Sequence, residues 1–202
     1  MNAIPLIFTS GWASGVNAYA VVLLLGLLGR FGDAGSVPPV LERTDVLVAA
    51  GVLFLCEAVF DKIPYVDSVW DAIHTVIRPI AGATVGALLA SHDPGSLGEV
   101  AAGAVGGTTA LVSHGIKASL RMAINTSPEP ASNIAVSLLE DLSVAGLVVL
   151  AVFHPWIAAT GAAVLLVLGG LLVWFAVTRI RRFLQRRRER RAARAGVPVA
   201  AG

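Results

Sequence analysis

Long apolar stretches alternate with short polar ones along most of this chain. Each apolar stretch is about as long as a helix needs to cross the hydrocarbon core of a bilayer, which takes roughly 20 residues. Proline, glycine and charged residues separate the stretches. We therefore expect six membrane-spanning helices, over residues 5–28, 44–60, 65–89, 97–120, 132–153 and 156–180.

The composition supports a membrane protein and excludes a soluble globular domain. Hydrophobic residues make up 56% of the chain and charged residues only 14%, whereas a soluble domain carries about 25% charged residues to solvate its surface. Much of this surface must therefore face lipid. The single cysteine, Cys56, lies in an apolar stretch and cannot form an internal disulfide.

Positive charge is concentrated at the C-terminal end. Nine of the fifteen basic residues lie at the end of the last apolar stretch or beyond it, namely Arg179, Arg181, Arg182, Arg186, Arg187, Arg188, Arg190, Arg191 and Arg194. The positive-inside rule places this end in the cytoplasm, and an even number of crossings then places the N-terminus there too. We expect a multi-pass protein of the inner (plasma) membrane, whose tail attracts anionic lipid rather than nucleic acid.

An internal repeat is indicated when the sequence is shifted by 91 residues. Residues that set backbone geometry then coincide, as do two arginines that end helices: Gly15 with Gly106, Arg30 with Arg121, Pro39 with Pro130, and Pro64 with Pro155. Each unit holds three expected helices, so the second unit must enter the membrane from the opposite side. The predicted fold is thus all-α, a polytopic membrane helix bundle of two inverted three-helix repeats.

The expected domain organisation follows from this repeat. A transmembrane domain covers residues 1–183, with repeat one at 5–92 and repeat two at 96–183, and a basic tail covers 184–202, either disordered or continuing the last helix. In inverted-repeat transporters the binding site lies near the midplane, where helices interrupted by Gly or Pro meet. The interruptions expected here are residues 11–17, their counterpart 101–109, and Pro79.

Polar residues within the spans are the candidate site. A charge at the bilayer centre costs about 2.5–3.5 kcal/mol on insertion scales, so such residues usually face a cavity or a partner. Helical spacings of three and four place them in stripes, with Arg121 extending one stripe. The candidates are Asn17, Glu57, Asp61, Asp67, Asp71, His74, Arg78, Thr108, His114, Lys117, Glu129, Asn133, Glu140 and Asp141.

Two interpretations of these residues are open. The acidic and basic stripes can neutralise each other as buried ion pairs and helix ends, which we favour for Asp61, Lys62 and Asp67 beside Pro64. They can also bind a solute or an ion, which we favour for the pair at 140–141, since it lies well inside a span.

Two chemistries suit such a group. Carboxylates and imidazole can bind a divalent cation, with Asp71, His74, Glu140 and Asp141 as candidate ligands. The same side chains can relay protons. No HEXXH, CXXC, GXSXG or P-loop pattern is present, so no soluble-enzyme motif accompanies them.

Three stretches in order resemble a bacterial membrane family catalogued as domain of unknown function 4126. They are GWASGVNAYAVVLLLGLLGR, DKIPYVDSVWDAIHTVIRP and NTSPEPASNIAVSLLEDLSVAGL, and the resemblance covers about residues 10–183. It implies that these stretches are the family's pattern, and they contain most of the polar candidates. It implies no catalytic role for any of them.

Three functions remain to be distinguished. The leading hypothesis is a small transporter or channel-like protein for an ion or a small polar solute. The second is an intramembrane metal-dependent enzyme acting on a lipid or isoprenoid-linked substrate, with Lys117 and Arg121 holding a phosphate. The third is a non-catalytic membrane scaffold that recruits partners or anionic lipid through its tail. Small bundles of this kind often form homo-oligomers, but the sequence indicates no interface.

Overall fold

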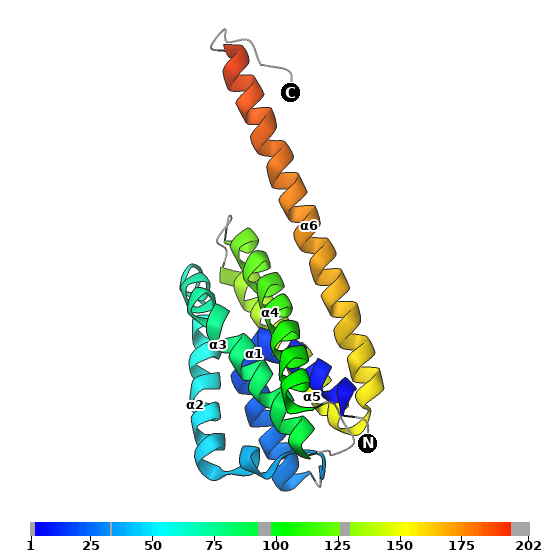
Figure 1. The fold of residues 1–202 in the computed structure, drawn as a ribbon. Helices are drawn as coiled ribbons and strands as arrows, with labels where there is room; N and C mark the ends of the chain where they lie inside the picture. Colours follow the sequence, from blue (N-terminus) through cyan, green and yellow to red (C-terminus); the bar gives the residue numbers. More distant parts are fainter. Residues whose placement is uncertain (1–2, 33, 93–97, 126–129, 195–202) are drawn as a thin grey trace.

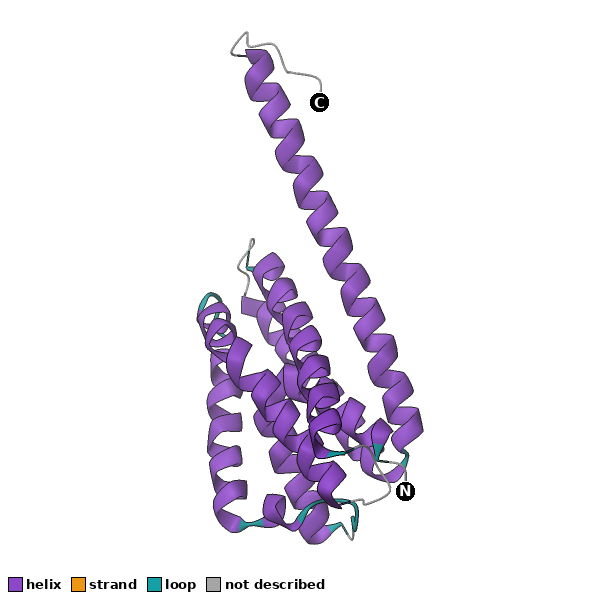
Figure 2. Ribbon diagram, viewed as in Figure 1, coloured by secondary structure: helices purple, strands orange, loops and turns teal. Residues whose placement is uncertain are grey.

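The computed structural model describes residues 3–32, 34–92, 98–125 and 130–194, and within these ranges the chain is helical and has no strand (Figures 1 and 2). This confirms the all-α prediction. The α-helices and one 3-10 helix are α1 Ile4–Phe31, η1 Pro39–Glu42, α2 Thr44–Phe60, α3 Val66–His92, α4 Glu99–Ile124, α5 Pro130–Phe153 and α6 Pro155–Arg194.

Helix α1 is a helical hairpin rather than a straight rod. Its backbone leaves the helical region at Asn17 (φ −151°, ψ 94°), which joins a first arm, residues 4–16, to a second arm, residues 18–31. The first arm enters from one end of the bundle, and the second arm returns to that end (Figure 1). This path differs from the single crossing that the sequence led us to expect over residues 5–28.

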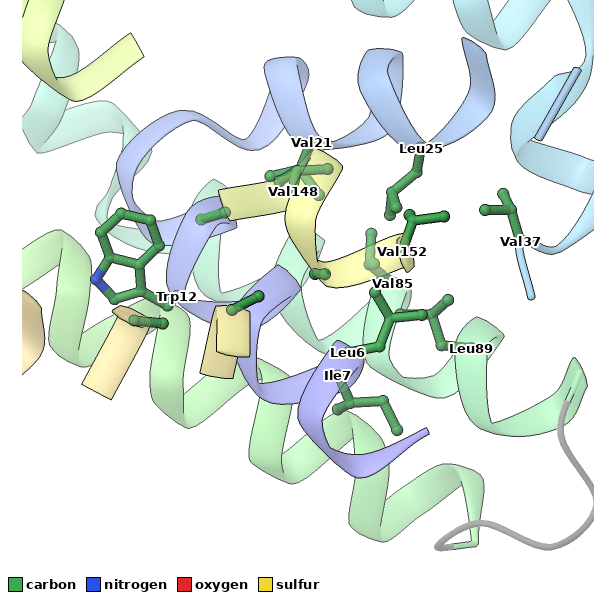
Figure 3. Packing of buried hydrophobic residues seen from close by; sticks show 14 of the residues in the cluster. Leu6, Ile7, Trp12, Val21, Leu25, Val37, Val85, Leu89, Val148 and Val152 are labelled. Atoms are coloured by element: carbon green, nitrogen blue, oxygen red, sulfur yellow. The ribbon is translucent and has the colours of Figure 1, made fainter. Parts of the chain in front are cut away.

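The hydrophobic core fixes the direction of the two arms. Leu6 in the first arm and Leu25 in the second belong to one buried cluster with Leu89 of α3 and Val152 of α5. Figure 3 shows Leu6 and Leu25 in the same part of the cluster, with Leu89 and Val152 between them, whereas Val21 lies farther away beside Val148. The arms therefore run antiparallel, and Asn17 forms the tip of the hairpin inside the bundle.

Small residues let the first arm, α3 and α4 pack closely. A Cβ added to Gly82 would lie 2.8 Å from the Gly106 carbonyl oxygen, and one added to Gly11 would lie 2.7 Å from that same atom. A Cβ added to Gly15 would collide with Ser113 and the Ala110 carbonyl. Close backbone approach through Gly and Ala is how membrane helices gain packing energy, since lipid supplies no hydrophobic driving force between them.

The outer surface of the bundle is apolar. Large hydrophobic side chains are exposed on several helices, among them Leu55 of α2, Leu142 of α5 and Trp174 of α6. Among the described residues, four helices are long and apolar enough to cross a membrane: Ile4–Phe31, Val66–Ser91, Ala131–Phe153 and Pro155–Arg187. We conclude that the protein is embedded in a membrane.

The helices are interrupted at fewer positions than the sequence predicts. Of the three predicted interruptions, residues 11–17 contain a break, at their last residue, Asn17. Helix α4 runs from Glu99 to Ile124 and includes the counterpart segment, and α3 continues through Pro79. Helix α6 has 40 residues and carries the first half of the basic tail beyond the bundle (Figure 1).

Candidate functional site

The tip of the α1 hairpin is held by the side chain of Asn17. Its Oδ1 accepts a hydrogen bond from the backbone N–H of Ala20 at 2.9 Å, and so caps the N-terminus of the second arm. Asparagine is among the best residues for this role. Its Nδ2 donates to Asp141 Oδ1 of α5 at 3.2 Å. The tip is therefore tied to a carboxylate near the positive end of the second arm, where an anion is favoured.

The first arm ends in carbonyl groups that have no further helical turn to bond with. Lys117 Nζ donates to the Val16 carbonyl at 3.0 Å, and Arg78 Nη1 donates to the Gly15 carbonyl at 3.3 Å. Cations near the C-terminus of a helix complement its dipole. The broken helix thus directs its negative end at two buried cations, which belong to α4 and α3.

Arg78 is the centre of one group of contacts. Its side chain is fully buried, and its Nη2 lies 2.8 Å from Glu57 Oε1 of α2. Its Nη1 lies 3.0 Å from Asp71 Oδ1, which is two helical turns earlier on α3. Nη1 also donates to His114 Nδ1 of α4 at 2.8 Å. One guanidinium therefore joins α2, α3 and α4.

Lys117 and Arg121 form a second group with the end of α2. Lys117 Nζ lies 2.5 Å from Asp61 Oδ2, and Arg121 Nη1 donates to the Asp61 backbone carbonyl at 2.6 Å. Arg121 Nη2 also lies 2.5 Å from Glu140 Oε2 of α5. Lys117 Nζ, at 3.6 Å from Glu57 Oε1, connects this group to the Arg78 group.

A third group lies beyond Arg121 along α4. Asn125 Nδ2 donates to Asp67 Oδ1 of α3 at 2.8 Å and to Ser68 Oγ at 2.9 Å. Asn133 Nδ2 of α5 is 3.5 Å from Asp67 Oδ2. Arg121 Nη1 is 3.8 Å from the same carboxylate, so the third group is continuous with the second.

The hydrogen bonds also orient two buried histidines and fix the tautomer of one of them. His114 Nδ1 accepts from Arg78, so its Nε2 carries the proton and donates to Thr75 Oγ1 at 3.1 Å. His74 Nδ1 donates to the Trp70 carbonyl at 2.8 Å, and its Nε2 lies 2.9 Å from the Tyr19 hydroxyl. The His114 imidazole is neutral in this arrangement, because one of its ring nitrogens accepts a hydrogen bond.

We call the ion-paired side chains together the charge network. Among the described residues, five buried or partly buried carboxylates, of Glu57, Asp61, Asp67, Asp71 and Glu140, pair with three cations, Arg78, Lys117 and Arg121. Several buried carboxylate oxygens make no hydrogen bond, including Glu57 Oε2, Asp61 Oδ1 and Asp71 Oδ2. A buried carboxylate without a full set of partners is costly, so this network is suited to take up protons or a cation.

The candidate metal ligands do not assemble into one site. Among the described residues, no group of three or more His, Cys, Asp or Glu side chains is placed to hold a metal ion. Asp71 instead faces Arg78, and Glu140 faces Arg121. His74 bonds to Tyr19, and Asp141 bonds to Asn17. Lys117 and Arg121, the cations that the sequence suggests for a phosphate site, form ion pairs with carboxylates.

Most of the predicted site residues that the structure describes converge, and Thr108 does not. Thr108 is exposed on α4 and makes no contact with the charge network, whereas its neighbour Thr109 is buried. Glu129 lies outside the described residues. The sequence reasoning missed Tyr19 and Asn125. Asn125 follows Lys117 and Arg121 at the same interval of four on α4, a signal that could have identified it.

A cavity of about 350 Å³ lies beside the network, between the first arm, α4, α5 and α6. Its wall is mainly apolar, with five leucines among the lining residues and Trp12 at one side. Lys117 and Glu140 are the charged residues at its surface. The network is therefore accessible from an apolar space within the bundle.

One comparison with known proteins identifies a family. A family model described as "Domain of unknown function (DUF4126)" matches residues 4–175, a range that holds the hairpin, the cavity and the whole charge network. Neither the search of curated proteins nor the search of solved structures found a match.

Proposed function

The chain belongs to the DUF4126 family, and from the hairpin and the charge network within the matched region we propose that it moves protons, or a solute coupled to protons, across a membrane. The observation that carries this proposal is the surplus of carboxylates over cations at the tip of a broken helix. Protons are the smallest ligands that can relieve such a surplus.

The broken helix supports transport over a purely structural network. Transporters commonly bind their substrate and coupling ion where a helix is interrupted near the midplane, because the free ends present carbonyls and N–H groups to the ligand. Here the interruption at Asn17 brings both free ends to charged side chains, the buried Lys117 on one side and the partly buried Asp141 on the other. Ion pairs needed only for stability do not require an interrupted helix.

The shared cations suggest how protonation would move the hairpin. Lys117 is divided between the Val16 carbonyl and the carboxylates of Asp61 and Glu140. A proton on Glu140 would weaken its ion pairs with Arg121 and Lys117. The hydrogen bond between Lys117 and the Val16 carbonyl at the hairpin tip would then change as well. Alternating access then follows from rearrangement of the hairpin against α4 and α5.

The topology proposed here differs from that expected from the sequence. With α1 returning to its own side, five helices, α2 to α6, cross the membrane, and the termini lie on opposite sides. The arginine-rich end of α6 is placed in the cytoplasm by the positive-inside rule. The start of α1 and the segment before α2 are then on the outer side of the plasma membrane.

The inverted repeat is retained as a proposal for part of each unit. Helices α2 and α3 run in the opposite directions to α5 and α6, their counterparts under the shift of 91 residues (Figure 1). Such opposite directions are what inversion requires. Helix α1 reverses direction inside the bundle, whereas its counterpart α4 continues across it. The first helices of the two units would therefore have diverged from each other most.

Flux measurements test the proposed function. The purified protein is reconstituted in liposomes that contain a pH-sensitive dye, and a potassium diffusion potential drives proton entry. We expect proton flux above that of protein-free liposomes, and at least a tenfold loss in Glu140→Gln. Asp45→Asn is the control, since Asp45 is exposed and its described contacts are with Arg43 and the backbone N–H of Val46. A folded Glu140→Gln protein with unchanged flux would refute the proposal, as would a wild-type protein without flux.

A further inference from the structure

We propose that the cavity between the first arm, α4, α5 and α6 binds a hydrophobic amine in its protonated form, with the ammonium on Glu140 and the apolar body among the leucines. This inference rests on the proposed function and names the substrate class of the transporter. The ammonium would enter as a proton leaves the charge network, so that one positive charge replaces another and the net charge of the site stays the same.

The cavity has the size and the walls of a small-molecule site. Its volume of about 350 Å³ falls within the range of about 300–1,000 Å³ that is typical of ligand pockets, which are mostly apolar with a few polar groups. Ile116, Leu120, Leu139, Leu165 and Leu168 line it, and Trp12 adds an aromatic face. The aliphatic side chains offer an amphiphile a place for its apolar part but no hydrogen bonds.

Glu140 supplies the polar end of the site. Its side chain keeps 16% exposure, the most of any carboxylate in the charge network. Both of its ion pairs, to Arg121 and to Lys117, use Oε2. No described residue donates a hydrogen bond to Oε1, so this oxygen is available to an ammonium group.

The charges favour a cation over an anionic lipid or a fatty acid. Lys117 is the only cation at the cavity surface, but its side chain is 2% exposed and its Nζ is held by Val16, Asp61, Glu57 and Glu140. It has no donor left for a phosphate or a carboxylate. An anion here would also meet a network in which carboxylates outnumber cations.

Binding of amphiphiles of equal chain length tests the inference. Radiolabelled dodecylamine is bound to the full-length protein, immobilised in detergent, and is competed with unlabelled dodecylamine, dodecanol or dodecanoate. We expect saturable binding that only the amine displaces at equal concentration. Glu140→Gln should weaken binding about tenfold or more, which corresponds to about 1.4 kcal/mol or more.

A second pair of variants tests the cavity itself and does not alter the network. Leu168→Trp should fill the space and abolish binding, whereas Leu171→Trp, at an exposed leucine outside the cavity, should leave it unchanged. Equal binding by all variants, or stronger competition by dodecanoate, would overturn the inference.

The same preparations separate this inference from the proposed function. Proton flux without amine binding would contradict the proposed substrate class but support the proposed proton transport. Amine binding without any flux would support the binding site but contradict the proposed transport.

Discussion

Asn17 and Asp141 are 124 positions apart in the sequence, and the 3.2 Å hydrogen bond between their side chains joins the tip of the α1 hairpin to α5. The same asparagine caps the second arm through Ala20. The Asn17 side chain thus both stabilises the turn between the two arms and connects that turn to the carboxylate of Asp141.

Two substitutions at Asn17 should separate these two roles. Asn17→Ala removes both the cap and the bond to Asp141, and loss of a cap costs about 1 kcal/mol. Asn17→Asp keeps an acceptor for the Ala20 N–H but has no donor for Asp141, and it adds a negative charge there. We expect thermal unfolding to show a lower melting temperature for Asn17→Ala, and proton flux to fall in both variants. Normal flux in Asn17→Asp would show that the bond to Asp141 is dispensable.

The contact between the hairpin and α4 should tolerate no side chain at Gly15. A Cβ there would collide with Ser113 and with the Ala110 carbonyl, both on the continuous helix α4. We expect Gly15→Ala to lower thermal stability strongly and to reduce the yield of folded protein. Gly115→Ala is the matched control, because no atom lies within 4 Å of its added Cβ. In a helix that change should be neutral or stabilising by up to about 1 kcal/mol.

The charge network was predictable because helix periodicity survives in the sequence. Asp67, Asp71, His74 and Arg78 occupy one stripe of α3, and Lys117 and Arg121 occupy one stripe of α4. Burial is expensive for any of them alone, so the stripes had to meet. The sequence could not show which carboxylate pairs with which cation, because the pairings depend on how each helix is rotated about its axis and shifted along it relative to its neighbours.

The hairpin was not predictable from hydropathy. Residues 4–31 are apolar on average and long enough to cross a membrane. A hydropathy average over a window does not show that the chain reverses direction. The local signal was a glycine-rich segment that ends in Asn17, which we interpreted as an interruption and not as a reversal of direction. The reversal requires partners for the freed carbonyls, and Arg78 and Lys117 are distant in sequence.

Loss of a buried cation should destabilise the protein far more than loss of an exposed one. Arg78→Met leaves Glu57 and Asp71 without their closest cation, and breaking a buried pair in this way typically costs about 3–5 kcal/mol. Arg43→Met is the control, because the side chains of Arg43 and Asp45 are 63% and 65% exposed and such pairs contribute about 0–1 kcal/mol. Thermal unfolding in detergent should show a large decrease for the first variant and almost none for the second.

A rescue experiment distinguishes charge imbalance from loss of packing at Arg78. If unpaired carboxylates cause the instability, Glu57→Gln in the Arg78→Met background should recover part of it. An equal or greater loss in the double variant would show that the size of the arginine side chain, and not its charge, holds α2, α3 and α4 together at this point.

Labelling of single cysteines should reveal the return of the hairpin. In a Cys56→Ala background, Ile4→Cys at the start of the first arm and Arg43→Cys before α2 both replace exposed residues, and Arg186→Cys replaces one in the tail. We expect a membrane-impermeant maleimide to label the first two in intact spheroplasts, and the third only after permeabilisation. Ile4→Cys is decisive, because a first helix that crossed the membrane would place residue 4 on the same side as the tail. Labelling of residues 4 and 186 under the same condition, with residue 43 under the opposite one, would contradict the hairpin and restore six crossings.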